Sequence, residues 1–505
     1  MWVPVFVVVR KSRKVTDPVK LGPISSVRNS SLDDRNIYLS TLLAVVALKV
    51  AVLLYWGPGI APDSGGYMSY GDMIFEDSSW WNDAGLLTGA MPITVFRMMG
   101  YPLFIGFLKV LSPNFWMWTV VLCQIALTAV SLVYLSRLIH ELKLRPLIGV
   151  FCMLSAGFSY SLTLDNMILT DSVVASIFVI ILSANAISSL RGEPIKFFQS
   201  FLFGTLLSIS FLFREGVLVL SSLFVIPLVI RVILTKSRHF RSCLAGTVFF
   251  APLLIISQIY IHWNETRTGS RFITTGGQTV YLQGLADAAR NDERIFSGQK
   301  VIDVTARENF VEFDFSEVLA IQKSLFSQGY EAPELAMISK EKYFQTWAEY
   351  PLSMLRMTIG HLRERFVLLT FRPLASLRET GFWIKGERPW GDYNVLKSRV
   401  FDGLGAFSLF TLESVERFIA IVVTLAFVIV PVVWFVRLCL GKKSNKGEVL
   451  VCCSLWSVYF GVMASHALVH IEPRYLAPVL PFSIVVGAFC LQNLVGRKGR
   501  QELTS

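Results

Sequence analysis

Long apolar stretches alternate with short polar ones along most of the chain. A helix needs about 20 mostly apolar residues to cross the hydrocarbon core of a bilayer. About ten stretches approach this length, and they cover residues 38–56, 114–138, 146–162, 172–190, 197–213, 217–233, 245–261, 418–440, 449–464 and 475–494. Shorter apolar stretches lie near residues 101–111 and 366–371. The pattern predicts an all-α polytopic membrane protein with about 10–13 transmembrane helices.

The composition narrows the class of protein further. Of the 505 residues, 53 % are hydrophobic and only 16 % are charged, whereas an ordinary soluble domain carries about 25 % charged residues. A soluble multidomain enzyme, a disordered scaffold and a secreted disulfide protein are therefore excluded. The 7 cysteines lie in or beside the predicted spans, so they form neither a disulfide framework nor a zinc-binding motif.

The charge distribution predicts the orientation of the chain. Lysine and arginine gather in the basic N-terminal segment 1–37, in every second loop after it and in the tail 495–505, which we therefore assign to the cytoplasm. The first loop on the other side, 57–113, is mainly acidic. This topology and contact with anionic lipid explain much of the net charge of +11. They give no reason to expect nucleic acid as a partner.

Two segments on the outer side are too long to be turns. The first is 57–113, within a transmembrane module 38–261, and the second is 262–417, before C-terminal spans at 418–494. Loops of this length are usually functional. We expect the second segment to be mixed or mainly helical, with helices near 316–327 and 333–349. Residues 350–371 predict an amphipathic helix on the membrane surface, and a helix packed on the outer segment is the alternative.

The most informative polar residue follows the first predicted span. Pro62 and the pair Gly65–Gly66 are expected to break the helix and to leave Asp63 at the outer membrane boundary. Partial burial there would raise the pKa of a carboxylate and make it a better base; a solvated turn is the alternative. Arg97 lies at the same boundary and suits a phosphate or carboxylate partner, unless it is a helix-end arginine reaching to water.

Each shorter outer turn also carries polar groups that can do chemistry. These groups are Asp165, Asp171, Arg214, Glu215, His466, His470, Glu472 and Arg474. Simpler roles are open for several of them: Asp171 can cap a helix, and Arg214 with Glu215 can form a structural ion pair. His466 and His470 have the spacing of metal ligands on a helix. The sequence does not place an acidic ligand with them, so it predicts no metal site, and a zinc site is the alternative.

The position of these charges separates two classes of membrane protein. Proton- or ion-coupled transporters usually need ionisable groups near the middle of the membrane. Here the predicted spans are almost free of charge at their centres, and the charges gather at the outer ends. That boundary is where an enzyme meets the headgroup of a lipid-linked substrate.

Three short motifs carry a resemblance to a known family. They are Asp63 followed by Tyr67, then Arg97-x-x-Gly100-Tyr101-Pro102-Leu103-Phe104, then Pro473-Arg474-Tyr475-Leu476-x-Pro478. In order, spacing and outer placement they resemble the C-type (GT-C) superfamily of membrane glycosyltransferases, especially the bacterial relatives of protein O-mannosyltransferases and the lipid A aminoarabinose transferase. The resemblance covers 38–261 and 418–494; segment 262–417 resembles no family that we can name.

The resemblance implies a GT-C-like fold and a specific reaction. A sugar moves from a polyprenyl monophosphate carrier, with inversion, to a hydroxyl of a glycan, lipid or protein at the outer face of the plasma (inner) membrane. By position, Asp63 matches the catalytic carboxylate. Many relatives have a second acid directly after it, where this chain has Ser64, and either Asp165 or Asp171 can replace that acid. No cofactor is required, although the resemblance leaves room for a divalent metal.

The same resemblance assigns expected roles to other residues. The growing negative charge of a leaving polyprenyl phosphate needs fixed cations, and the candidates are Arg97, Arg214 and Arg474. Further site candidates near the motifs are Tyr67, Tyr101, Glu215, His470, Glu472 and Tyr475. The acceptor would bind under segment 262–417.

Three other functions stay open at this point. A transporter or flippase of a lipid-linked or small solute would use Arg214 and Glu215 within the bundle. A ligase of the same superfamily would move a whole glycan from a polyprenyl diphosphate. A non-catalytic assembly protein would use its outer segment to bind a partner, but it would not need an acid or a cation at each outer turn.

Overall fold

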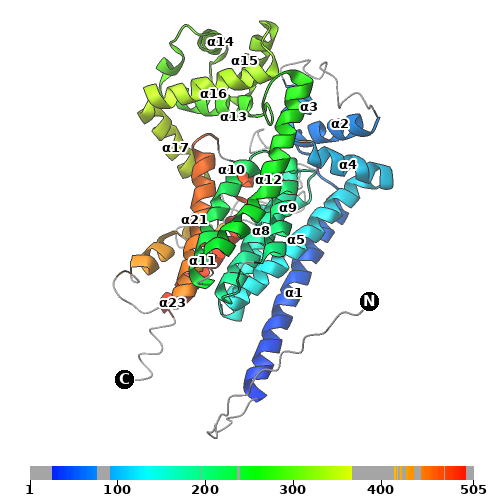
Figure 1. Cartoon of the computed structure of the whole chain (residues 1–505), viewed down its shortest axis with the longest axis vertical. Helices are drawn as coiled ribbons and strands as arrows, with labels where there is room; N and C mark the ends of the chain where they lie inside the picture. Colours follow the sequence, from blue (N-terminus) through cyan, green and yellow to red (C-terminus); the bar gives the residue numbers. More distant parts are fainter. Residues whose placement is uncertain are drawn as a thin grey trace.

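The chain folds into helices in this computed structural model (Figure 1). The structure describes residues 25–76, 91–194, 196–235, 239–366, 415–416, 418, 421–423, 428–436, 439, 445–470 and 472–495. Within these ranges it contains no named β-strand, only an isolated bridge between Gly59 and Met167. The all-α prediction is therefore confirmed for the described part of the chain. All seven cysteines are unpaired, as expected.

Among the described residues, six helical segments are long and apolar enough to cross a membrane. They are α1 (Ser25–Trp56), α5 (Trp116–Glu141), α8 (Thr170–Leu190), the continuous run of α10 (Val217–Ser221), η3 (Ser222–Phe224) and α11 (Val225–Thr235), α12 (His239–Thr268), and α21 (Lys446–Ala467). The protein is thus an all-α membrane protein.

Within the described part of the chain, several predicted spans are shorter than a full membrane crossing. Three of the predicted spans form helices of only 13–17 residues, namely α6 (Pro146–Phe158), α9 (Phe197–Phe213) and α23 (Leu480–Val495). At 1.5 Å per residue a helix of this length covers only part of a bilayer. The predicted span 418–440 lies partly outside the described residues.

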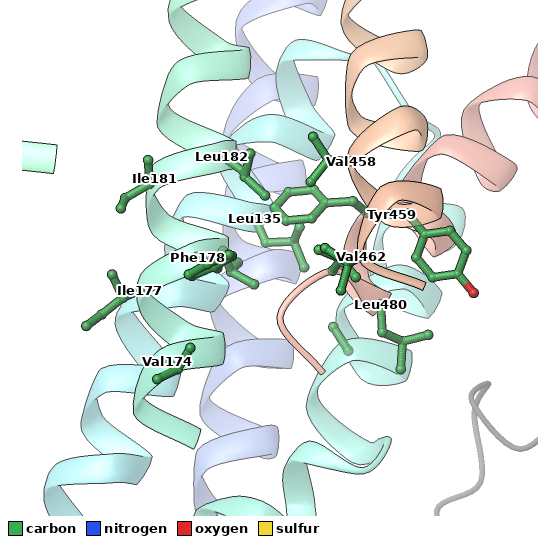
Figure 2. Close-up of a cluster of buried hydrophobic side chains, with 14 of the residues drawn as sticks. Leu135, Val174, Ile177, Phe178, Ile181, Leu182, Val458, Tyr459, Val462 and Leu480 are labelled. Atoms are coloured by element: carbon green, nitrogen blue, oxygen red, sulfur yellow. The ribbon is translucent and has the colours of Figure 1, made fainter. Parts of the chain in front are cut away.

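Helix α8 forms the centre of the bundle. In its most apolar stretch 89 % of the residues are buried, against 28–44 % in the other five candidate spans. Side chains of α5, α21 and α23 belong to the same buried cluster as those of α8, and Figure 2 shows Phe178 and Leu182 of α8 with Leu135 of α5 and Val462 of α21. A helix that is apolar all round is suited to this central position, because every face meets another helix.

The other helices expose apolar side chains at the periphery. Leu54 of α1, Leu147 of α6, Phe198 of α9 and Ile255 of α12 are all exposed. Isolated exposed apolar residues are ordinary in soluble proteins, but a ring of them around a helical bundle is suited to contact with lipid.

The first long loop contributes helices at one end of the bundle, the end where α1 finishes at Trp56. We call it the upper end, as it is drawn in Figure 1. There α2 (Pro62–Glu76) packs against α4 (Gly100–Leu111), and the short α3 (Ile93–Phe96) precedes α4. The predicted helix break at the glycine pair is wrong, because Gly65 and Gly66 lie inside α2. The break falls earlier, at Gly57, whose φ of 81° ends α1.

A second helical unit, which we call the cap, covers part of the upper end (Figure 1). It consists of α13 (Gly277–Ala289), η4 (Glu293–Phe296), α14 (Val301–Asn309), α15 (Phe315–Ser327), α16 (Ala332–Glu349) and α17 (Pro351–Phe366). The cap has an apolar core of its own. The helices predicted near 316–327 and 333–349 are confirmed. The boundary predicted at 262 falls inside α12, which continues to Thr268.

Helix α17 packs on the cap, as one of the two alternatives states, while the predicted contact with the membrane surface stays a prediction. Met354 and Met357 are buried in the core of the cap, so one face packs on that unit. Leu352, Leu355 and Ile359 are exposed on the helix. Residues 367–371 of the predicted helix lie outside the described residues.

Candidate functional site

Asp63 lies between two arginines that come from opposite ends of the sequence. Nη2 of Arg97 donates to Oδ1 of Asp63 over 2.6 Å, and Nη1 of Arg474 donates to Oδ2 over 2.7 Å. Each carboxylate oxygen thus has its own guanidinium. The Asp63 side chain keeps 25 % of its surface exposed, so the ion pairs are accessible from outside the protein.

Local sequence explains how two of these residues reach the site. Pro62 is the first residue of α2, where its fixed φ suits a helix and its missing N–H is not needed. Asp63 therefore lies in the first turn, where the partial positive charge of the helix end favours a carboxylate. Arg474 is placed in the same way, because Pro473 starts the short helix α22 (Pro473–Leu476).

Arg97 is held by the packing of the segment around it. It follows α3 in an extended conformation. Thr275, in the connection between α12 and α13, donates its backbone N–H to the carbonyl of Val95 over 2.9 Å and so fixes α3. Gly100 begins α4 next to the backbone of α9, where a Cβ would lie only 2.6 Å from the carbonyl oxygen of Leu212. Close packing against α9 therefore explains why this motif has glycine at position 100.

The pKa of Asp63 is shifted in the opposite direction from the prediction. Burial does raise it, as expected, but the charges and hydrogen bonds of Arg474 and Arg97 outweigh burial and lower the pKa to about 2. The prediction of a raised pKa is therefore wrong for the protein without a ligand. The sequence does not reveal that Arg97 and Arg474 lie within hydrogen-bond distance of Asp63. The main cause of the lowered pKa could therefore not be predicted from it.

A second ion pair lies beside the first. Arg214, directly after α9, binds Asp171 in the first turn of α8. The Arg214 guanidinium also lies over the ring of Tyr475, 4.5 Å from its centroid. The two outer turns predicted to carry site residues therefore meet α22 at one place.

Glu472 connects the two ion pairs. Its Oε2 lies 2.5 Å from Nε of Arg474, and its Oε1 accepts a hydrogen bond from the Tyr475 hydroxyl over 3.3 Å. Burial alone would raise the pKa of Glu472, but Arg474 and nearby His470 hold it below its usual range. We call Asp63, Arg97, Asp171, Arg214, Glu472, Arg474 and Tyr475 the Asp63 cluster.

Three other predicted site residues lie at the edge of this cluster. The hydroxyl of Tyr67 accepts a long hydrogen bond of 3.5 Å from Nη1 of Arg97. Tyr101 stands behind it, edge-on to the Tyr67 ring, and donates its hydroxyl proton to Gln124 over 2.7 Å. Burial would lower the pKa of Arg97, yet the nearby carboxylates of Asp63 and Glu215 help to hold it above its usual value.

Asp165 lies elsewhere. Its Oδ2 accepts a hydrogen bond of 2.7 Å from Nζ of Lys49 on α1, and both side chains are only 1 % exposed. Thr128 and Ser172 donate to its other oxygen. Between the two candidates for a second acid, the structure therefore places Asp171 in the cluster and Asp165 outside it. The expectation that the spans are almost free of charge overlooks Lys49, although its place between apolar neighbours is visible in the sequence.

The two histidines with helical spacing do not face each other as metal ligands. His466 lies on α21 with its ring 4.7 Å from that of Tyr475. His470 follows the end of the helix and lies 3.4 Å from Oε1 of Glu472. The two residues do not share one face of a helix, because α21 ends at Ala467, between them.

No family model and no curated protein matches the chain. The resemblance to the GT-C superfamily therefore stays a prediction.

Proposed function

We propose that the protein is an integral-membrane glycosyltransferase that moves a sugar from a polyprenyl-phosphate carrier to an acceptor hydroxyl, and that the Asp63 cluster is its active site. The reaction takes place at the outer face of the plasma (inner) membrane. The proposal combines the three sequence motifs with the position at which their residues meet.

One observation supports the proposal most strongly. Arg97 and Arg474 are separated by most of the sequence, yet their guanidiniums bind the two oxygens of one carboxylate. Guanidinium groups are suited to phosphate as well as to carboxylate. We propose that the phosphate of the donor takes up these arginines when it binds, with Arg214 as a third cation nearby. Its polyprenyl chain would lie in lipid beside the bundle.

Release of Asp63 from the two arginines would make it a better base. A carboxylate with a pKa of about 2 is a weak base. Once the donor phosphate neutralises Arg97 and Arg474, the pKa of Asp63 rises and the carboxylate becomes a better base. Donor binding thus prepares the base in the same step that brings the sugar.

The bond changes then follow from the positions of the charges. The acceptor hydroxyl gives its proton to Asp63 while its oxygen forms a bond to the anomeric carbon. The bond from that carbon to the phosphate oxygen breaks, and the electron pair leaves with the polyprenyl phosphate. The arginines stabilise the extra negative charge, which is usually the largest contribution of such a site. Asp171 holds Arg214 in place.

The proposal can be tested in cells with and without the protein. Mass spectrometry of lipid extracts and surface glycans should show one polyprenyl-phosphate sugar that accumulates in the cells lacking the protein, together with one glycan that loses that sugar. The accumulated lipid names the donor. If both the lipid-linked sugars and the glycans are identical in the two strains, the proposal is wrong.

A second candidate function has one observation in its favour. The buried pair of Lys49 and Asp165 lies inside the bundle, where a transporter would place ionisable groups. A cavity of about 30 Å³, lined in part by Thr128, Ser131 and Ser176, adjoins Asp165. That volume holds roughly two water molecules, far less than a sugar needs. We therefore prefer the enzyme, and a flux measurement in sealed vesicles separates the two functions.

A further inference from the structure

A second cluster of potential ligands lies where the cap meets the upper end of the bundle. Asp287 comes from α13, His361 from α17, and His470 from the turn between α21 and α22. One ligand atom from each of the three residues lies within 4.8 Å of the other two. Nε2 of His361 is 3.1 Å from Oδ2 of Asp287, and Nδ1 of His470 is 4.0 Å from the same oxygen.

In each imidazole ring, the nitrogen that points away from Asp287 already has a hydrogen-bond acceptor. Nδ1 of His361 lies 2.9 Å from the carbonyl oxygen of Ala467, and Nε2 of His470 lies 3.4 Å from a carboxylate oxygen of Glu472. A carbonyl and a carboxylate can only accept, so a neutral ring that donates to them carries its proton on this nitrogen. In the neutral rings, the nitrogens that face Asp287 therefore present lone pairs.

In these tautomers, three electron-rich atoms face one another: Nε2 of His361, Nδ1 of His470 and Oδ2 of Asp287. In the neutral rings a lone pair of His361 and a lone pair of His470 both approach the carboxylate of Asp287, and this arrangement needs either a further proton on an imidazole or a bound cation among the three groups. Nδ1 of His470 is buried and has no hydrogen-bond partner among the described residues. An unsatisfied buried group of this kind costs about 1–3 kcal/mol, and a bound cation would remove that cost.

The distances suit a small metal ion. Zinc binds imidazole nitrogen and carboxylate oxygen at about 2.0–2.2 Å in a tetrahedral arrangement, which places neighbouring ligand atoms roughly 3.3–3.5 Å apart. The observed separations of 3.1 and 4.0 Å lie on either side of that value. Ligating histidines also characteristically donate their second N–H to a carbonyl or a carboxylate, as Ala467 and Glu472 accept here.

We propose that Asp287, His361 and His470 bind a divalent transition-metal ion of the zinc type, with a water molecule in the fourth position. Two imidazoles and one carboxylate favour such an ion over magnesium or calcium, which prefer oxygen ligands. The ion would join α13 and α17 of the cap to the turn that carries Glu472. Since Glu472 also holds Arg474, the ion would fix one wall of the Asp63 cluster without taking part in its chemistry.

The test measures metal content of the full-length protein, purified in detergent with a tag that contains no histidine. The protein is stripped with a chelator, loaded with zinc, desalted and analysed by elemental mass spectrometry. The wild-type protein should hold about one zinc ion per chain, and His361→Gln and Asp287→Asn should lower the affinity at least about tenfold. His262→Gln is the matched control, because the His262 side chain is 80 % exposed and should not affect zinc content.

A second measurement uses the wild-type protein alone, so that it does not depend on how the variants fold. X-ray absorption of the zinc-loaded protein should show nitrogen and oxygen ligands at about 2.0–2.2 Å, with no sulfur at about 2.3 Å. Zinc content in the wild type no higher than in the two ligand variants, or a sulfur shell from the cysteines, would overturn the proposal. None of these readouts involves sugar transfer, so the result is independent of the proposed enzymatic function.

Discussion

The Asp63 cluster and the pair of Lys49 and Asp165 balance their charges in different ways. Lys49 and Asp165 are completely buried, and hydrogen bonds from Thr128 and Ser172 satisfy the carboxylate further. Asp63 is partly exposed and shares its two oxygens between two arginines. A closed pair of the first kind holds helices together, whereas an accessible group of the second kind can exchange one partner for a ligand.

The largest expected difference between the two regions is in sugar transfer. Asp63→Asn should lower the transfer rate about 10²–10⁴-fold, the usual contribution of a general base. It should also cost about 1–3 kcal/mol of stability, because Arg97 and Arg474 lose their common partner. The rate is measured as glycan product per amount of folded protein.

A matched control lies on the same helix. Asp72 of α2 pairs with Lys109 and is more exposed than Asp63. Asp72→Asn removes the same charge and should leave transfer nearly unchanged. Equal activities of the wild type and Asp63→Asn would remove Asp63 from the mechanism.

The largest effect on folding should come from the buried pair. Lys49→Met leaves the Asp165 carboxylate buried without a cation, and breaking such a pair from one side costs about 3–5 kcal/mol. The double variant Lys49→Met/Asp165→Asn removes both charges and should recover at least part of this loss. Both effects are measured as thermal stability in detergent. A fully stable Lys49→Met variant would show that the pair does not stabilise the bundle.

A smaller effect is expected from a conservative change of one arginine. Arg474→Lys keeps the positive charge but loses the planar fork that contacts Asp63 and Glu472 together. Donor affinity should fall about tenfold, or about 1.4 kcal/mol. Saturation curves with the donor lipid measure this effect. An unchanged affinity would exclude Arg474 from the phosphate site.

The smallest expected effect concerns pH. The pKa of Asp63 in the free protein is about 2, below its ordinary value of 3.8. The stabilisation from its ion pairs is therefore complete above about pH 4 and is lost as the pH falls through about 2. The protonation of Asp63 in the free protein should therefore cause no fall in kcat/KM above about pH 4.

The pH dependence of kcat gives a sharper comparison. Because the bound phosphate would take up both arginines, the acidic limb of kcat should lie at least about one pH unit above any limb of kcat/KM. Coincident limbs would contradict the exchange of partners that we propose for Asp63.

The sequence predicted the general position of the site better than its internal contacts. Apolar periodicity and the placement of Asp63, Arg97 and Arg474 after or before predicted spans were enough to expect all three at one end of the bundle, since helix ends meet there. The direction of the Asp63 pKa depends on two distances of less than 3 Å. Such distances come from tertiary packing and have no local signal in the sequence.

Two other features illustrate the same limit. Residues 49 and 165 are far apart in the chain, and only the packing of the helix bundle shows that Lys49 neutralises Asp165. His361 lies on a helix that the sequence indicated as interfacial, and its contact with Asp287 depends on how α17 folds back onto α13. The helical spacing of His466 and His470 gave a clear local signal, but the helix ends before the second residue.

Sugar transfer by this protein can be observed directly in a reaction of the purified protein in sealed vesicles. The donor is the lipid extract from cells that lack the protein, and the products are identified by mass spectrometry. We predict that the sugar moves to the acceptor while polyprenyl monophosphate is released. Release of a polyprenyl diphosphate would instead indicate a ligase, and movement of an intact lipid or solute across the membrane without bond cleavage would indicate a transporter. Either of these two results would contradict the account.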